Sequence, residues 1–215
     1  MKKTFCLFLL LALGLSSTAL AAGNKPPRSQ QILLVEVQNP KDSGATVTGL
    51  GLGGNGWQVE LPPMPARIGR EGLAAKNAKR EGDGKSPYGQ YLIGTAFGSA
   101  PALPAGAKMP YRHTTEHDFW VDDVNSPDYN TWVSGKEPTV SHEKLLRPEY
   151  DYALVVEYNT GPVTPGLGSA IFMHIWRDQN TATSGCVALS KENLEKILVW
   201  LDPEKLPTIK LKRVE

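Results

Sequence analysis

The fold is decided by the segments SAIFMHIW (residues 169–176) and TSGCVAL (residues 183–189), which lie near the C-terminal end of a 215-residue chain. The first segment is apolar and contains aromatic and β-branched residues, which predicts a buried strand. A polar loop follows, and the chain then returns through Gly185, Cys186 and Val187. This strand, loop and return would bring the imidazole of His174 and the thiol of Cys186 to neighbouring positions.

A neighbouring imidazole would give Cys186 the partner that a nucleophilic thiol needs. An ordinary cysteine has a pKa of about 8.5 and is mostly protonated at neutral pH. A histidine can take the proton during attack and return it to the leaving amine. Gly185 allows a close backbone approach, so the N–H groups of Gly185 and Cys186 could stabilise an oxyanion. A histidine alone in a strand is more often a core residue, but His174 together with Cys186 predicts a catalytic pair.

Strand-like segments and one helix surround this region. Strands are predicted at 31–37, 88–97, 152–158 and 208–214, and a hairpin is predicted over 45–61 around the turn GGNG (53–56). Residues 193–201 carry leucine and isoleucine at helical spacing, with Ser190 as N-cap and Pro203 beyond the end. Residues 99–148 are irregular, so they form either a functional loop or short elements that the pattern does not reveal. The fold class is therefore mainly β (α+β) with one clear C-terminal helix.

Composition agrees with this fold class and excludes some functions. The 21 glycines and 17 prolines favour a strand-rich, loop-rich domain over a helical bundle. With 23 Lys+Arg against 22 Asp+Glu the net charge is +1, which argues against nucleic acid as a partner.

The N-terminus has the pattern of a secretory signal peptide. Lys2 and Lys3 precede the apolar stretch 5–15, and ALA (19–21) is a small-residue cleavage site. We therefore expect a signal peptide at 1–21, a polar lead-in at 22–30 and one domain at 31–215, without stable membrane insertion after cleavage. Cleavage also removes Cys6, so Cys186 would be the one thiol of an exported protein located in the periplasm or cell envelope.

Three stretches resemble the L,D-transpeptidase catalytic domain (YkuD-like) family of bacterial cell-wall cross-linking enzymes. They are KREGDGKSPYGQY (79–91), WVDD (120–123) with Ser126, Tyr129 and Asn130, and GSAIFMH (168–174) followed by SGC (184–186). The resemblance implies a β-sandwich-like domain that acts on peptidoglycan stem peptides. It also implies that Cys186 forms a thioester with release of D-alanine, that His174 is the general base and acid, and that no cofactor or metal is needed.

The chain departs from the commoner family motif around its cysteine. Thr183 and Ser184 replace Ser-His before Gly-Cys, and Ala188 stands where an arginine or asparagine is usual. Recognition of a substrate carboxylate therefore needs another residue. Arg177 is a candidate, although it could be a solvated loop cation, and Ser184 and Trp176 are further candidate substrate-binding residues.

Two other functions remain open. A hydrolase on the same scaffold, an L,D-carboxypeptidase or endopeptidase, would use the same pair with water as the acceptor. A non-catalytic wall-binding protein would not require both His174 and Cys186.

Other polar and aromatic clusters have structural alternatives. His113, His117, Asp118, Asp122, Asp123 and His142 could suggest a metal site, but a substrate cleft or plain surface is favoured. Trp120, Tyr129, Trp132 and Trp176 could line a groove or belong to the core. Residues 76–80 are expected to form a solvated basic loop.

Overall fold

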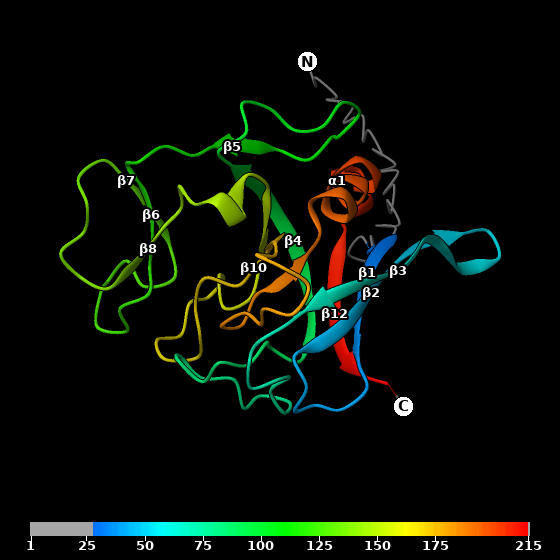
Figure 1. The fold of residues 1–215 in the computed structure, drawn as a ribbon, viewed down its shortest axis with the longest axis horizontal. Coiled ribbons are helices and arrows are strands. Elements are labelled where there is room, and N and C mark those ends of the chain that lie inside the picture. Colours follow the sequence, from blue (N-terminus) through cyan, green and yellow to red (C-terminus); the bar gives the residue numbers. More distant parts are fainter. Residues whose placement is uncertain (1–27, 215) are drawn as a thin grey trace, which may run out of the picture.

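The computed structural model describes residues 28–214, which form a mainly β domain with one α-helix, as the sequence predicts (Figure 1). The predicted signal peptide (1–21) and most of the predicted lead-in lie outside the described residues. The strands are β1 (Gln31–Val37), β2 (Gly44–Gly53), β3 (Gly56–Arg67), β4 (Gly89–Gly98), β5 (Tyr111–His113), β6 (Asp118–Val121), β7 (Trp132–Ser134), β8 (His142–Lys144), β9 (Ala153–Val156), β10 (Phe172–Ile175), β11 (Val187–Leu189) and β12 (Thr208–Arg213). The helices are α1 (Lys191–Trp200) and the short 3-10 turns η1 (Pro148–Tyr150) and η2 (Pro203–Lys205).

Nine strands form a large sheet in the order β12-β1-β2-β3-β11-β10-β9-β4-β5. Strand β12 pairs in parallel with β1 and also antiparallel with β4, so the sheet closes on itself around a core, which gives a sandwich-like arrangement. The alternating pattern of β1 points Leu33, Val35 and Val37 into this core, where each is at most 1% exposed. The apolar face of α1 covers the same core with Leu194 and Ile197.

The predicted elements are largely confirmed, but several of their ends differ. Strand β3 continues to Arg67, beyond the predicted hairpin end at residue 61, and β9 (Ala153–Val156) is shorter than the predicted 152–158. Helix α1 begins at Lys191, two residues before the start that the apolar spacing indicates, because the Ser190 side chain accepts a hydrogen bond from Asn193 N–H at 3.2 Å and caps the helix there. Strand β10 begins at Phe172 because Ala170 has φ 51°, a left-handed conformation that a strand does not contain.

The irregular region 99–148 contains short elements. Strands β6, β7 and β8 form a separate sheet in the order β7-β6-β8, which lies to the left in Figure 1. It packs against the outer face of β4, β9 and β10 through a second cluster of buried side chains: Phe97, Trp120, Leu145, Tyr150, Ala153, Val155, Phe172 and Cys186. The second cluster forms one wall of the site described below.

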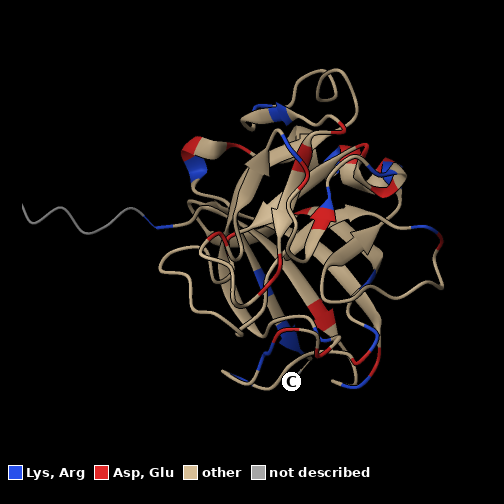
Figure 2. Cartoon of the chain, turned by 90° about the vertical axis from the view of Figure 1, so that its left-hand side faces the viewer, with Lys and Arg blue, Asp and Glu red and all other residues tan. Residues whose placement is uncertain are grey.

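No helix within residues 28–214 combines the length and the apolar character that a bilayer span requires. Figure 2 shows basic and acidic side chains interspersed over the elements in that view, rather than separated into a basic and an acidic face.

Candidate active site

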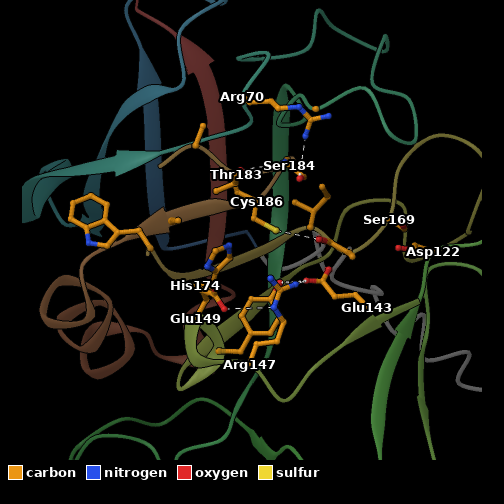
Figure 3. Close-up of a pocket in the computed structure, with 18 of the residues that line it drawn as sticks. Arg70, Asp122, Glu143, Arg147, Glu149, Ser169, His174, Thr183, Ser184 and Cys186 are labelled. Carbon is orange, nitrogen blue, oxygen red and sulfur yellow. Dashed lines mark hydrogen bonds and ion pairs between the residues drawn. The ribbon is translucent and has the colours of Figure 1, made fainter. Parts of the chain in front are cut away.

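A cleft of about 780 Å3 lies between the outer face of the large sheet and the β6–β8 sheet (Figure 3). It is lined by residues from the loop 79–84, from 142–150, from 169–177 and from the loop that leads into β11. Both His174 and Cys186 line it.

The parallel pairing of β10 with β11 puts His174 and Cys186 on one face. His174 is opposite Ala188, and Met173 is opposite Val187. Opposite residues share a face, so Ala188 faces the same way as His174. Cys186 directly precedes β11 and packs in the second cluster with Phe172, which is two residues before His174 on β10 and shares its face. Met173 and Val187 point to the other face and join the main core. The structure therefore brings together the two residues that the sequence selects.

Cys186 is held as a neutral thiol. It is 8% exposed, its S–H donates to the Ala170 carbonyl at 3.3 Å, and its sulfur accepts from Phe172 N–H at 3.4 Å. Burial, and then the nearby Glu143 carboxylate, raise the pKa of the thiol to about 12.

His174 is oriented by a backbone carbonyl. Its Nδ1–H donates to the Ile175 carbonyl at 2.8 Å, which leaves the lone pair on Nε2. The ring packs edge-on against Tyr150, with centroids 5.2 Å apart. Burial lowers the pKa of His174 to about 4, so the imidazole is neutral at pH 7. Any residue has a backbone carbonyl, so no sequence signal could have identified this orienting group.

The loop before Cys186 is fixed by hydroxyl groups. Thr183 Oγ1 donates to the Cys186 carbonyl at 2.7 Å and accepts from Gly185 N–H at 3.1 Å. The fully buried Ser86, which belongs to the SP pair of the family-like stretch, donates to the Gly185 carbonyl at 2.6 Å. Because its N–H is already bonded, Gly185 would have to exchange this bond to serve the expected oxyanion role.

The candidate substrate-binding residues lie in the cleft but differ in availability. Arg177 is exposed, yet its guanidinium is paired with the Glu149 carboxylate. Trp176 is partly buried and lines the cleft. Ser184 is exposed and accepts a hydrogen bond from Arg70 Nη1 at 3.2 Å. Sequence reasoning missed Arg70, which lies 114 residues before Ser184 and carries no local signal of its position.

The expectation that residues 76–80 form a solvated basic loop is wrong for Lys79. Lys79 is 5% exposed and lines the cleft. Its ammonium group pairs with Asp83 at 2.7 Å and donates to the Arg80 carbonyl at 2.6 Å. A buried lysine is stable here because its charge is paired.

Of the other polar and aromatic residues, Asp122 and His142 line the cleft, whereas Asp118, Trp120 and Tyr129 have structural roles. Burial alone would raise the pKa of Asp118, but hydrogen bonds from Ser134 and Trp132 lower it to about 2, so this carboxylate anchors the small sheet. Within residues 28–214, no three His, Cys, Asp or Glu side chains are grouped to hold a metal ion. Trp120 and Tyr129 are 6% and 2% exposed and belong to the interior.

A closed, mainly β domain with a cysteine and a histidine in one cleft is a scaffold suited to acyl transfer through a thiol. The family model of the L,D-transpeptidase catalytic domain (YkuD) matches residues 53–209, and the chain belongs to this family. Proteins of this family are typically found in the cell envelope.

The solved structures that the chain is similar to share little sequence with it. Pgp2 from Campylobacter jejuni, described as a helical cell shape determining protein, is 18% identical with a TM-score of 0.43, and the match covers 87% of this chain and 49% of Pgp2. Bd1075 from Bdellovibrio bacteriovorus is 17% identical with a TM-score of 0.43, over 86% of this chain and 48% of Bd1075. The chain thus spans about half the length of these proteins. No curated protein sequence matches it.

Proposed function

We propose that the chain is an exported, cysteine-dependent peptidoglycan L,D-transpeptidase. In this reaction Cys186 Sγ attacks the carbonyl carbon of an L,D-peptide bond in a stem peptide, and a thioester forms as D-alanine leaves. An amine of a second stem peptide then attacks the thioester and forms the cross-link. The observation that carries the proposal is the common face of His174 and Cys186 in a cleft of an L,D-transpeptidase-family domain.

The protonation states of the resting pair determine the order of the proton steps. Burial disfavours both charged forms, so a thiolate beside an imidazolium does not accumulate before substrate binds. Cys186 S–H must leave the Ala170 carbonyl and turn to His174 Nε2, which takes the proton as the sulfur attacks. His174 then gives this proton to the departing amine of D-alanine. In the second half-reaction His174 takes a proton from the acceptor amine and returns it to sulfur.

The test incubates the purified chain with tetrapeptide muropeptides and follows the products and the intact protein by mass spectrometry. We expect cross-linked dimers, free D-alanine and a Cys186 adduct with the mass of the stem peptide minus D-alanine. Cys186→Ser and His174→Gln should each reduce product formation by at least about 1,000-fold. Met173→Leu is the matched control, because Met173 lies on the same strand and faces the core.

Each alternative has its own outcome in this test. Trimmed monomers without dimers would identify a hydrolase, in which water replaces the acceptor amine. Identical product profiles for the wild type and Cys186→Ser would contradict cysteine catalysis and favour a wall-binding role. N-terminal sequencing of the exported protein tests cleavage after Ala21.

A further inference from the structure

The cations of the cleft differ in whether a carboxylate already neutralises them. Five basic side chains line the cleft, and four of them are paired. The pairs are Lys79 with Asp83 at 2.7 Å, Lys144 with Glu137 at 2.9 Å, Arg147 with Glu143 at 2.7 Å, and Arg177 with Glu149. Among the residues that the structure describes, Arg70 is the cleft cation that takes part in no ion pair.

The position of Arg70 is fixed relative to the nucleophile. Its backbone N–H donates to the Thr183 carbonyl at 2.8 Å, and Thr183 N–H donates to the Ile68 carbonyl at 3.0 Å. These two bonds join the segment 68–70, which carries Arg70, to the loop that carries Cys186. The guanidinium passes close to Gly84, where an added Cβ would lie 3.0 Å from Arg70 Cζ.

The Arg70 guanidinium keeps most of its hydrogen-bonding capacity for a ligand. One Nη1 donor reaches Ser184 Oγ, and Ser184 is two residues before Cys186. A guanidinium has five N–H donors in a planar fork that fits a carboxylate with two parallel hydrogen bonds. Arg70 is exposed in the described structure, so a ligand in the cleft can reach it.

The cleft therefore has two different ends. Figure 3 shows Arg70 on one side of Cys186, and Glu143, Arg147 and Glu149 on the other. At the far end the charges cancel within the Arg147 network, in which Glu143 also accepts a hydrogen bond from Tyr150 at 2.6 Å. Among the described residues that line the cleft, the unneutralised cation for an anionic ligand group is at the Arg70 end.

We propose that Arg70 binds the terminal carboxylate of the donor stem peptide, the carboxylate of the D-alanine that leaves. This inference rests on the proposed function and assigns a specificity-determining residue to it. The leaving D-alanine carries its carboxylate one carbon away from the nitrogen of the cleaved bond, so the group that binds it must lie close to the nucleophile. Arg70 thereby selects a stem peptide in which D-alanine, the residue after the cleaved bond, is the last residue.

Binding to an inert protein tests the inference without turnover. The Cys186→Ala protein is titrated by calorimetry with a synthetic stem tetrapeptide that ends in D-alanine, and with the same peptide as its C-terminal carboxamide. We expect the acid to bind about ten-fold more tightly than the amide, because a charged partner of the guanidinium is lost in the amide. Adding Arg70→Met should weaken acid binding about ten-fold and leave amide binding unchanged.

Two further variants make the test specific. Arg213→Met removes an exposed arginine at the end of β12 and should leave the ratio of the two affinities unchanged. If Arg177→Met removes the preference for the acid and Arg70→Met does not, Arg177 is the carboxylate-binding residue and the inference is overturned. If the acid and the amide bind equally, the inference about Arg70 is overturned, whereas the proposed function is not contradicted. If neither peptide binds, the proposed function is contradicted and the inference falls with it.

Discussion

Lowering the pH from 7 to 4 should destabilise the wild-type fold by about 3 kcal/mol more than it destabilises the His174→Gln variant. His174 is 9% exposed, and burial lowers its pKa from 6.5 to about 4. The unfolded chain binds a proton at this histidine near pH 6.5, whereas the folded chain does not do so until about pH 4. The stability that the neutral histidine contributes is therefore complete above pH 6.5 and is lost as the pH falls through 4.

The magnitude follows from the two pKa values. Each pKa unit between the folded and unfolded states corresponds to about 1.36 kcal/mol, so the interval from 6.5 to about 4 gives roughly 3 kcal/mol. Glutamine cannot take up a proton in this pH range, so the stability of the His174→Gln variant has no contribution from protonation at position 174. Carboxylates that titrate in the same range are common to both proteins and cancel in the difference.

Urea unfolding followed by tryptophan fluorescence at pH 7, 5.5 and 4 measures this difference. His113→Gln is the matched control, because it makes the same substitution at an exposed histidine. Equal pH dependence of the wild type and His174→Gln would refute the reasoning. An imidazolium paired with a Cys186 thiolate would reverse the sign, because a raised pKa makes the wild type gain stability relative to the variant as the pH falls.

Three further predictions concern Cys186, the glycine before it and the core beside it. Because the pKa of Cys186 rises from 9.0 to about 12, iodoacetamide should alkylate the folded chain at pH 8 about 1,000-fold more slowly than the urea-unfolded chain. The rate is measured on the tryptic peptide that contains Cys186. Equal rates for the folded and unfolded chains would contradict a buried neutral thiol. Gly185→Ala should lower the free energy of unfolding by about 1–3 kcal/mol, because Gly185 has φ 154° and an added Cβ would lie 3.1 Å from a backbone carbonyl oxygen. In the control Gly54→Ala, an added Cβ has no atom within 4 Å. This control should cost less than about 1 kcal/mol in the same urea assay. Phe172→Ala should lower the free energy of unfolding by about 3–5 kcal/mol, since this fully buried ring contacts three other aromatic rings. The control is Val59→Ala, at a site that is 63% exposed. An equally small loss of stability in both variants would disprove the packing argument.

Local patterns predicted much of the large sheet and the helix. Strand β1 has the predicted bounds, and the GGNG turn joins β2 to β3 with Gly53 opposite Gly56. These elements are long enough to show a periodicity, and their turns and caps are set by residues within a few positions. In contrast, β5, β7 and β8 have three residues each, which is too short for an alternating pattern to be recognised.

The sequence by itself determined which thiol and which imidazole to consider. Cys186 is the one cysteine beyond the predicted signal peptide, and His174 is only twelve residues before it. The short separation made their proximity predictable, because a strand, a loop and a return leave few other arrangements.

Only the tertiary structure decided the surroundings of this pair. It closed the large sheet through the pairing of β12 with β4 and placed the Ile175 carbonyl on His174. It also paired Arg177 with Glu149 and placed Arg70 beside Ser184, two residues before Cys186. Such contacts join residues that are far apart in the chain, or use backbone atoms that every residue has. They arise from the packing of the whole domain, so no local pattern in the sequence encodes them.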